Sequence, residues 1–381
     1  MIADHPFLAC YYFPNYHADA RNAGVHGPGW TEWEVLKAAR PRWRGHRQPR
    51  APRWGYTDEA DPRAMERKIA AAAGHRIDAF VFDWYWYEDG PFLQRALDEG
   101  FLRARNRERL KFALMWANHD WTDIHPQKLR ENPRVLYPGA LSARGFERLT
   151  DKVVRDYFSR PNYWRIAGAP YFSIYDLAAF IRGLGGIEPA IAALRRFREK
   201  TRRAGHRDLH LNIVYWQRGL LAGEKALPVT AAFLRRLGAD STTSYVWIHH
   251  VPLRSFPTTS YAWVFARYRE YLDATARRFA GLPHYPNVTM GWDSSPRTVS
   301  SDRFLRGEYP FLPALSGNTP AAFRRALSAM KGWLAGRPPG QRILTLNAWN
   351  EWTEGSYLEP DTEHGYGYLE AVREVFGPPV P

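Results

Sequence analysis

Short apolar runs alternate with amphipathic segments along the whole chain. Eight of these runs have the length and the β-branched or aromatic content of buried strands, and segments of helical periodicity lie between them. The strands expected are residues 7–13, 79–87, 112–116, 170–176, 209–216, 241–247, 287–293 and 343–349. The helices expected are residues 61–74, 92–102, 143–158, 188–205, 230–237, 261–279, 319–336 and 366–376. Eight strand-then-helix units predict an α/β fold, a single (β/α)8 TIM barrel.

No low-complexity linker and no internal repeat interrupts this alternation. We therefore expect residues 1–381 to form a single catalytic domain, a length that barrels of this class often reach. The first predicted strand is followed by a polar and aromatic excursion, residues 14–58. Long βα loops of this kind are expected to form the active-site face.

Polar and aromatic side chains gather where the predicted strands end. Parallel strands of a barrel present their carboxyl ends on one face, and that face carries the active site. A strand-end Asp or Asn is also an ordinary turn or cap residue, so a single one decides little. Eight strand ends with such a residue favour a site: Asn15, Asp83, Asn118, Asp176, Tyr215, Trp247, Asp293 and Glu351.

The last predicted strand runs into a cluster of carboxyl and indole groups. Glu351 and Glu354 face one small volume if the chain turns after Glu351, and Gly355 permits such a turn. Paired carboxyl groups in different surroundings are the usual means of breaking a glycosidic bond. The flanking Trp349 and Trp352 suit the C–H faces of a sugar. A polar loop that merely caps the strand is the alternative, and the Asn, Trp and Gly neighbours favour chemistry.

Composition supports a carbohydrate ligand more than other ligand classes. The hydrophobic share of 45% and charged share of 24% are ordinary for a globular protein, but 16 Trp and 21 Tyr are not. Carbohydrate sites use many aromatic side chains. The one cysteine, Cys10, excludes an intramolecular disulfide framework and a cysteine-based zinc site. Its apolar surroundings predict a small buried hydrophobe.

The net charge of +14 raises the question of an acidic partner. Most of the basic residues are Arg in helix-like segments such as 194–203, which is typical of the solvated face of an amphipathic helix. We expect no nucleic-acid partner. An anionic glycan, or peripheral contact with acidic lipid, agrees better with this charge. The sequence points to no obligate protein partner.

Targeting signals are missing from the printed sequence. The N-terminus lacks a basic segment followed by an apolar one, and no apolar run approaches the roughly 20 residues of a membrane helix. The expectation is a soluble, cytoplasmic protein with no integral membrane segment. A mature form whose leader has been removed stays open.

Neither a metal nor a cofactor is expected. Among 13 His, the pairs His249–His250 and His119–His125 lack the helical spacing with an interposed Glu that marks a zinc site. Core or surface histidines are the better interpretation. A glycine-rich phosphate loop and an Asp-x-Asp flanked by apolar residues are both missing as well.

Several motifs together resemble a known family. They are Phe-Pro-Asn-Tyr-His at 13–17, Gly-Trp-Thr-Glu-Trp at 29–33, Gly-His-Arg-Gln-Pro at 45–49, Trp-Ala-Asn at 116–118, Trp-Asn-Glu-Trp-Thr-Glu-Gly at 349–355, Tyr-Leu-Glu-Pro-Asp at 357–361 and Tyr-Gly-Tyr-Leu at 366–369. The sequence is similar in these to the WbsX-like proteins, relatives of glycoside hydrolase family 99, the endo-α-mannosidase family. The resemblance runs from about residue 7 to 374, and the motif at 349–355 is the most specific.

The resemblance implies a fold and a mechanism. Family 99 enzymes are (β/α)8 retaining glycosidases that are thought to act through a 1,2-anhydro sugar. Transferred to this sequence, Glu351 would deprotonate the 2-hydroxyl of the substrate and Glu354 would protonate the leaving oxygen. Glu354 would then need a raised pKa, and Glu351 would have to stay ionised. Glu359 either orients the pair, binds another hydroxyl, or belongs to loop structure alone.

The motifs and the strand ends also define a set of expected substrate contacts. The set comprises Asn15, Tyr16, His17, Trp30, Glu32, Trp33, His46, Gln48, Asp83, Trp84, Trp86, Trp116, Asn118, His119, Tyr175, Tyr215, Trp247, Trp292, Asp293, Trp349, Asn350, Trp352, Tyr357 and Glu359. Two motifs depart from the family pattern. Many relatives have an acidic residue directly after Trp-Ala-Asn, whereas this sequence has His119 followed by Asp120. The second predicted strand ends in Asp83-Trp-Tyr-Trp, where relatives often have His-Tyr-Trp. A mannose specificity is therefore not implied.

The interpretation favoured is a retaining glycoside hydrolase that acts on a bacterial-type polysaccharide or oligosaccharide. The alternative is a glycosyltransferase or transglycosylase of surface polysaccharide biosynthesis, O-antigen or capsule, because WbsX-like proteins are often named so. A non-catalytic carbohydrate-binding barrel is the third, and the presence of both Glu residues speaks against it.

Overall fold

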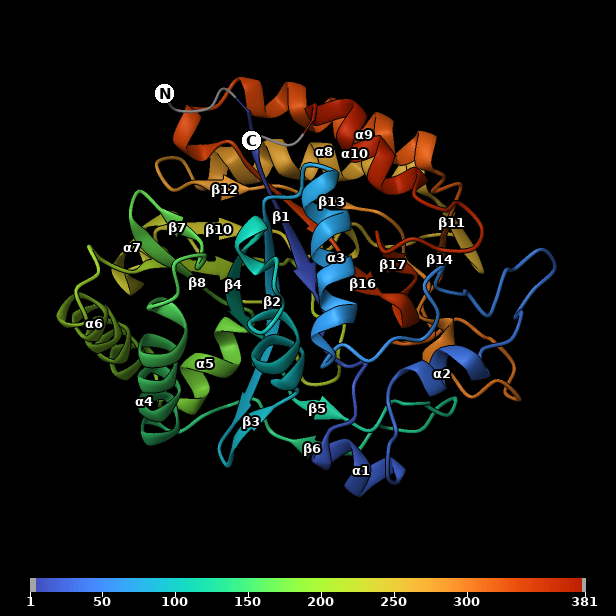
Figure 1. Ribbon diagram of the computed structural model, residues 1–381, viewed down its shortest axis with the longest axis horizontal. Helices are drawn as coiled ribbons and strands as arrows, with labels where there is room; N and C mark the ends of the chain where they lie inside the picture. Colours follow the sequence, from blue (N-terminus) through green and yellow to red (C-terminus); the bar gives the residue numbers. More distant parts are fainter. Residues whose placement is uncertain (1–4, 379–381) are drawn as a thin grey trace.

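The computed structural model describes residues 5–378, and its centre is a ring of parallel strands (Figure 1). Neighbouring strands pair in the order β12–β10–β9–β8–β4–β2–β1–β15–β13. These strands are β1 (Phe7–Tyr12), β2 (Ala79–Tyr87), β4 (Lys111–Trp116), β8 (Ala169–Ile174), β9 (His210–Val214), β10 (Ser241–Thr243), β12 (His284–Tyr285), β13 (Asn287–Thr289) and β15 (Ile343–Asn347).

The two ends of this order are consecutive in the chain. Strand β12 pairs with β10, β13 pairs with β15, and only Pro286 separates β12 from β13. A proline has no N–H to donate to a ladder, so it interrupts the strand, while its carbonyl still accepts from Thr345 N at 2.9 Å. The two short strands together occupy the seventh of eight positions, and the predicted eight-unit barrel is confirmed.

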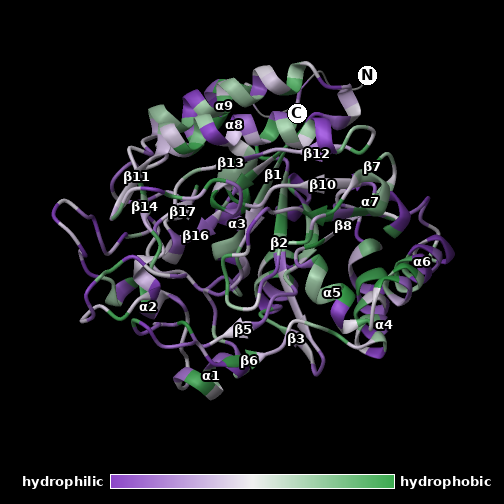
Figure 2. Cartoon of the chain, turned by 180° about the vertical axis from the view of Figure 1, so that it is seen from behind, coloured by the Kyte–Doolittle hydropathy of each residue, from purple (hydrophilic) through white to green (hydrophobic). Residues whose placement is uncertain are grey.

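Most helices cover the outside of the ring, and two short ones lie among the long loops at one end of it (Figure 1). The helices are α1 (Ala20–His26), α2 (Trp33–Ala38), α3 (Pro62–Gly74), α4 (Ala143–Lys152), α5 (Leu177–Gly183), α6 (Ile187–Arg203), α7 (Ala231–Leu237), α8 (Tyr261–Arg278), α9 (Pro320–Ala335) and α10 (Gly367–Phe376). All nine residues of β2 are buried, as expected for a parallel strand with both faces covered. In Figure 2 the central strands are largely green and the long loops largely purple or white.

Most predicted helices begin where their sequence signals lie. The side chains of Asp61, Thr230 and Thr319 accept a backbone N–H at the starts of α3, α7 and α9. Short helices within loops escaped prediction: α1, α2 and α5. The segment expected to be helical at 92–102 contains only a π-helix, Ala96–Phe101, after the short strand β3 (Gly90–Phe92). Residues 143–158 divide into α4 and a π-helix, Val153–Phe158.

The sixth strand is shorter than expected. It ends at Thr243, and Trp247 begins a 3-10 helix, Trp247–His249, instead of closing the strand. The polar residues 241–243 pair with the neighbouring strands. Pairing ends after Thr243, because the residues that follow leave the sheet and pack in other directions. Within the part of the chain that is described, no single helix is long and apolar enough to cross a membrane, although α5 and α6 pass that test as a pair bent by 98°.

Small two-stranded sheets decorate the loops. They pair β5 (Trp121–Thr122) with β6 (Val135–Tyr137), β11 (Thr258–Ser260) with β14 (Ala314–Ser316), and β16 (Asn350–Glu351) with β17 (Ser356–Tyr357), while β7 (Arg165–Ile166) pairs with β8. The β5–β6 and β16–β17 pairs extend from the carboxyl ends of β4 and β15. They build up the face of the barrel where the site was expected.

Candidate active site

The β16–β17 hairpin brings Glu351 and Glu354 into one cleft. A 3-10 turn, Trp352–Glu354, connects its strands, and Gly355 ends the turn in the left-handed conformation with φ of 62°. A Cβ on Gly355 would lie 2.7 Å from Asp293 Cβ and 2.9 Å from Asp293 N, so only glycine fits here. The turn expected at this position is present, and both carboxyl groups line the same cleft.

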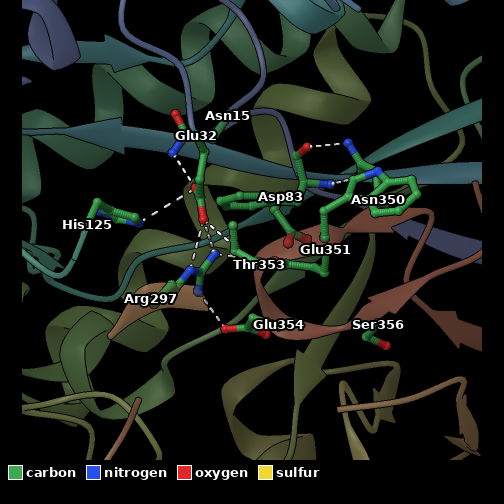
Figure 3. A network of polar contacts seen from close by, with 12 residues as sticks. Asn15, Glu32, Asp83, His125, Arg297, Asn350, Glu351, Thr353, Glu354 and Ser356 are labelled. Atoms are coloured by element: carbon green, nitrogen blue, oxygen red, sulfur yellow. Dashed lines mark hydrogen bonds and ion pairs between the residues drawn. The ribbon is translucent and has the colours of Figure 1, made fainter. Parts of the chain in front are cut away.

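Arg297 links the two carboxyl groups (Figure 3). It lies on a short 3-10 helix, Ser295–Arg297, in the loop that follows β13. Its Nη1 is 2.6 Å from Glu354 Oε1, and its Nη2 is 3.4 Å from Glu351 Oε2. The Tyr309 hydroxyl donates to Glu354 Oε1 at 2.7 Å. Glu354 is therefore the more strongly bound of the pair.

Glu32 is the third carboxyl group that binds Arg297. Arg297 Nη2 is 2.8 Å from Glu32 Oε1, and Asn15 Nδ2 donates to Glu32 Oε2 at 2.6 Å. The Thr353 hydroxyl also donates to Glu32, and His125 Nε2 is 3.6 Å from it. Burial opposes ionisation of Glu32, but Arg297 and these donors together lower its pKa. Glu32 is thus an anion that holds the guanidinium in place.

The carboxyl groups of Glu351 and Glu354 differ in proton affinity. Burial, and then the charge of Glu354, raise the pKa of Glu351 well above its ordinary value, against the weaker effect of Arg297. Burial raises the pKa of Glu354 as well, but Arg297 and Tyr309 counteract it. In the protein alone, the closer contacts with Arg297 and Tyr309 favour the anionic form of Glu354 over that of Glu351. The roles implied by the family resemblance need the opposite distribution.

Asp83 and Tyr245 form the wall next to Glu351. The Tyr245 hydroxyl lies 2.8 Å from Asp83 Oδ2 and 3.3 Å from Glu351 Oε1. Asp83 Oδ1 is buried and has no hydrogen-bond partner in the protein. Burial, with a further contribution from Glu354, raises the pKa of Asp83 well above its usual range despite the bond from Tyr245. The surroundings of Asp83 therefore favour its neutral form, and its Oδ1 is available to a ligand hydroxyl.

Aromatic and apolar side chains make up most of the cleft, whose atom-free space is about 670 Å³ out to the mouth. Among the described residues that line it, Arg297 is the one Arg or Lys. Buried Trp292 Nε1 and His249 Nδ1 have no protein partner. The lining consists of Phe13, Asp83, Tyr85, Met115, Ala117, His119, Asp120, Trp121, Thr122, Ile124, His125, Tyr175, Leu220, Leu221, Tyr245, Val246, His249, Trp292, Arg297, Tyr309, Glu351 and Glu354. Aromatic faces with a few unpaired polar atoms suit a sugar ring.

Six of the sequence-predicted site residues line the cleft: Asp83, His119, Tyr175, Trp292, Glu351 and Glu354. The alternation of side chains along a strand explains why their neighbours do not. On β2, Asp83 and Tyr85 face the cleft, whereas Trp84 and Trp86 face outward and stack on each other at 5.6 Å. At the end of β4, Trp116 and, two residues later, Asn118 likewise lie outside the cleft lining, and Asn118 Nδ2 donates to the Asp176 carbonyl at 2.7 Å.

Other predicted residues support the loops from behind. His46 Nε2 and Gln48 Nε2 each lie 2.8 Å from Asp293 Oδ2. Against the effect of burial, the hydrogen bond and charge of His46, together with the side chains of Ser295 and Gln48, lower the pKa of Asp293 to about 2. Asp293 is therefore a buried anchor of the loop that carries Arg297, outside the lining of the cleft.

The remaining predicted contacts also lie outside the cleft lining. Seven of them are buried in the β16–β17 hairpin or next to it: Tyr16, Trp33, Trp349, Asn350, Trp352, Tyr357 and Glu359. Trp30 stacks on His26, and Tyr215 packs against Phe279. His17 is buried, and burial, with a further contribution from Arg95, lowers its pKa to about 3. Trp247 is buried against α8, with Nε1 donating to the Asn287 carbonyl.

Sequence reasoning missed Arg297, Tyr245 and Tyr309. Arg297 follows the strand-end residue Asp293 by four positions, and that proximity was the available signal. His125 and His249 were considered only as metal ligands, yet both line the cleft. Across residues 5–378, His, Cys, Asp and Glu side chains nowhere form a group of three or more that could hold a metal ion.

Comparison with known proteins gives a family and a fold. A family model described as "Glycosyltransferase WbsX" matches residues 8–372. The protein WxcX of Xanthomonas campestris pv. campestris strain B100 is 27% identical over 371 residues, and a WxcX from another strain is 27% identical over 376. Each alignment covers 97% of this chain and 49% of the relative, so the chain spans about half the length of these curated relatives.

Two solved structures resemble the whole chain. The GH99 endo-alpha-mannosidase from Bacteroides thetaiotaomicron superposes with a TM-score of 0.52 at 16% identity, covering 99% of this chain and 97% of that one. A structure described as a glycoside hydrolase-like protein gives a TM-score of 0.62 at 15% identity, with 99% and 95% covered. At these identities the likeness shows the fold alone, a (β/α)8 barrel.

Proposed function

This chain belongs to the WbsX family, and from that premise we propose that it cleaves glycosidic bonds as a retaining glycoside hydrolase. The observation that carries the proposal is the pair Glu351 and Glu354, joined by Arg297 in an aromatic cleft at the carboxyl ends of the barrel strands. Two carboxyl groups of unequal proton affinity in one cleft are what acid and base catalysis of this cleavage requires.

The mechanism proposed uses the 2-hydroxyl of the substrate. Glu351 takes the proton of this hydroxyl, O2 bonds to the anomeric carbon, and the bond to the leaving oxygen breaks as Glu354 gives it a proton. Water then opens the 1,2-anhydro ring: Glu354 takes the proton of the water, and Glu351 returns its proton to O2. Two displacements at the anomeric carbon retain its configuration.

These roles need the proton of the pair to lie on Glu354 when substrate is bound. Arg297 is the group that most lowers the pKa of Glu354 in the protein alone. A substrate that draws Arg297 away from Glu354 therefore raises the pKa of that carboxyl and favours this distribution. Glu351, 3.4 Å from Arg297, gains a closer cationic partner if the guanidinium moves towards it.

A glycosyltransferase is the second candidate, because the family model carries that name and the relatives are twice as long. A nucleotide diphosphate donor would need cations in the cleft. Arg297 is the one Arg or Lys in its described lining, and Glu32, Glu351 and Glu354 already surround it. This arrangement favours an uncharged group at the reacting centre, and the anionic substrate inferred from net charge stays a prediction.

The test is a substrate screen with a stereochemical readout. Wild-type protein, Glu351→Gln and Glu354→Gln are incubated with bacterial surface polysaccharides, oligosaccharides and aryl glycosides, and separately with sugar nucleotides plus acceptors. The control is Glu370→Gln, an exposed carboxyl on α10. We expect new reducing ends with retained anomeric configuration by NMR, which both site variants fail to form from the unactivated polysaccharides and oligosaccharides and which the control still forms. Inverted products, or turnover of sugar nucleotides alone, contradict the proposal.

A further inference from the structure

Lys68 is a fully buried lysine on α3, outside the cleft lining. Its Nζ lies 3.0 Å from Glu59 Oε1 and 2.9 Å from Glu359 Oε1, and it donates to the Tyr12 hydroxyl at 3.1 Å. The four side chains come from β1, from the segment before α3, from α3 itself and from the segment after β17. A buried lysine needs such partners, since an isolated ammonium ion inside a protein is very unfavourable.

Each of the two carboxylates also holds a neighbour of Glu351. Glu59 Oε1 accepts from Asn350 Nδ2 at 2.6 Å, and Asn350 exchanges two further bonds with the backbone of Phe13. Glu359 Oε2 accepts from Trp352 Nε1 at 2.7 Å. The residues immediately before and after Glu351 are therefore fixed through carboxylates that meet at one ammonium group.

We propose that Lys68 is a positioning residue, which sets the place of the Glu351 carboxyl group by fastening Asn350 and Trp352 through Glu59 and Glu359. The inference deepens the proposed function and rests on it for its kinetic consequence, but its structural consequence stands alone. Lys68 touches no group in the cleft lining. It acts only through the backbone of the hairpin.

Loss of the ammonium group would leave two carboxylates buried on opposite sides of the same space. Like charges at such a distance repel, and burial of both is strongly unfavourable. Either they take up a proton or the segments that carry them move apart. Movement of either segment shifts the hairpin, and a displacement of about 1 Å in a reacting group lowers the rate by about 10²-fold.

The experiment compares Lys68→Met with a matched control, Arg198→Met. Arg198 lies on α6, is also largely buried, and is paired with Asp240 and Asp208, on the side of the barrel away from the hairpin in Figure 1. Crystal structures of both variants report the Glu351 carboxyl position, and thermal unfolding reports stability. Kinetics use whichever glycoside of the screen the wild type cleaves.

The expected result is a displaced Glu351 carboxyl and a kcat lowered about 10²-fold in Lys68→Met, with KM changed less than about threefold. The Arg198→Met variant should lose thermal stability but keep kcat and the Glu351 position. A Lys68→Met protein with an unmoved hairpin and wild-type kcat overturns the proposal. If the wild type cleaves no glycoside, the proposed function fails, and the crystallographic comparison still decides the position of Glu351.

Two milder variants keep the test decisive if Lys68→Met does not fold. The Glu359→Gln variant keeps one acceptor oxygen, whereas Glu359 uses a separate oxygen for Trp352 Nε1 and for Lys68 Nζ, so one of the two bonds is lost and kcat should fall while KM is kept. The Trp352→Phe variant removes the indole donor together with part of the buried ring and should also lower kcat while KM is kept. Wild-type kcat in both variants would show that the bond from Trp352 to Glu359 does not position Glu351.

Discussion

Arg297 and Glu354 form an ion pair of 2.6 Å in which each side chain is less than a tenth exposed. A pair this deeply buried is worth keeping only where its geometry and its further hydrogen bonds compensate for lost hydration. Arg297 meets this condition because Glu32 and the Tyr309 hydroxyl also accept hydrogen bonds from its guanidinium group. Arg297 is therefore a fixed positive charge beside two carboxyl groups. Its closer contact with Glu354 makes the proton affinities of the two groups differ.

Replacement of Arg297 should damage both catalysis and stability. An Arg297→Met variant leaves Glu32 buried without its cation, which costs about 3–5 kcal/mol of unfolding free energy. It should lower kcat/KM by at least about 10²-fold. Because Arg297 lowers the pKa of Glu354, the proposed acid, its loss raises that pKa, and the alkaline limb of the pH–rate profile moves to higher pH. Arg324→Met, which breaks an exposed pair with Glu374, is the control and should change neither quantity.

The roles of the two carboxyl groups are separable by leaving group. Glu354→Gln should slow cleavage of an unactivated glycoside by about 10²–10⁴-fold, the usual contribution of a general acid. The loss should be far smaller for a 2,4-dinitrophenyl glycoside, because that phenolate departs without a proton. Glu351→Gln should lose activity on both substrates. The reverse pattern would make Glu351 the acid, in keeping with its longer distance from Arg297 in the protein alone.

Gly355 should tolerate no side chain. Gly355→Ala places a Cβ 2.7 Å from Asp293 Cβ on a residue with φ of 62°, so either the hairpin or the Arg297 loop must move. We expect about 1–3 kcal/mol of destabilisation, measured by urea denaturation, together with a loss of activity. Gly24→Ala is the control, since its Cβ meets nothing within 4 Å and it lies in helix α1. That variant should be neutral or slightly stabilising.

Asp293 should make the protein lose stability in acid. Its pKa of about 2 in the folded protein is below the value of about 3.9 for an unfolded chain. The stabilisation is present above pH 4 and is lost as the pH falls towards 2, and it amounts to about 2 kcal/mol. Asp293→Asn should therefore be less stable than the wild type at pH 6, with the difference shrinking below pH 4. Urea denaturation from pH 2 to 6 measures it; a constant difference would contradict the assigned pKa.

The barrel was predictable because its strands are buried on both faces. Such strands appear as continuous apolar runs, and β2 or β15 is visible in the sequence without any alignment. The seventh position was predicted only in part. Strand β12 has only two residues, 284–285, and Pro286 follows it, so no apolar run in the sequence is long enough to mark this strand.

That Glu351 and Glu354 share one cleft was predictable, but the other side chains that line it were less so. Strand ends and family motifs selected Trp84 and Trp116 together with Asp83, although alternate residues of a strand face opposite sides. Applying that alternation from Asp83 would have added Tyr85 and removed Trp84 and Trp86. Arg297 and Tyr309 could not be placed in this way, because both lie in a loop whose path depends on Asp293, His46 and Gln48.

The setting of Glu32 limits how the site can be transplanted. Its carboxylate receives Asn15 from the first βα loop, Arg297 from the seventh and Thr353 from the eighth. A designer who grafted only the 349–359 hairpin onto another barrel would transfer two acids without the cation that distinguishes them. The smallest exchangeable cassette is therefore three loops moved together, and recombination among homologues should preserve their combination as one inherited unit.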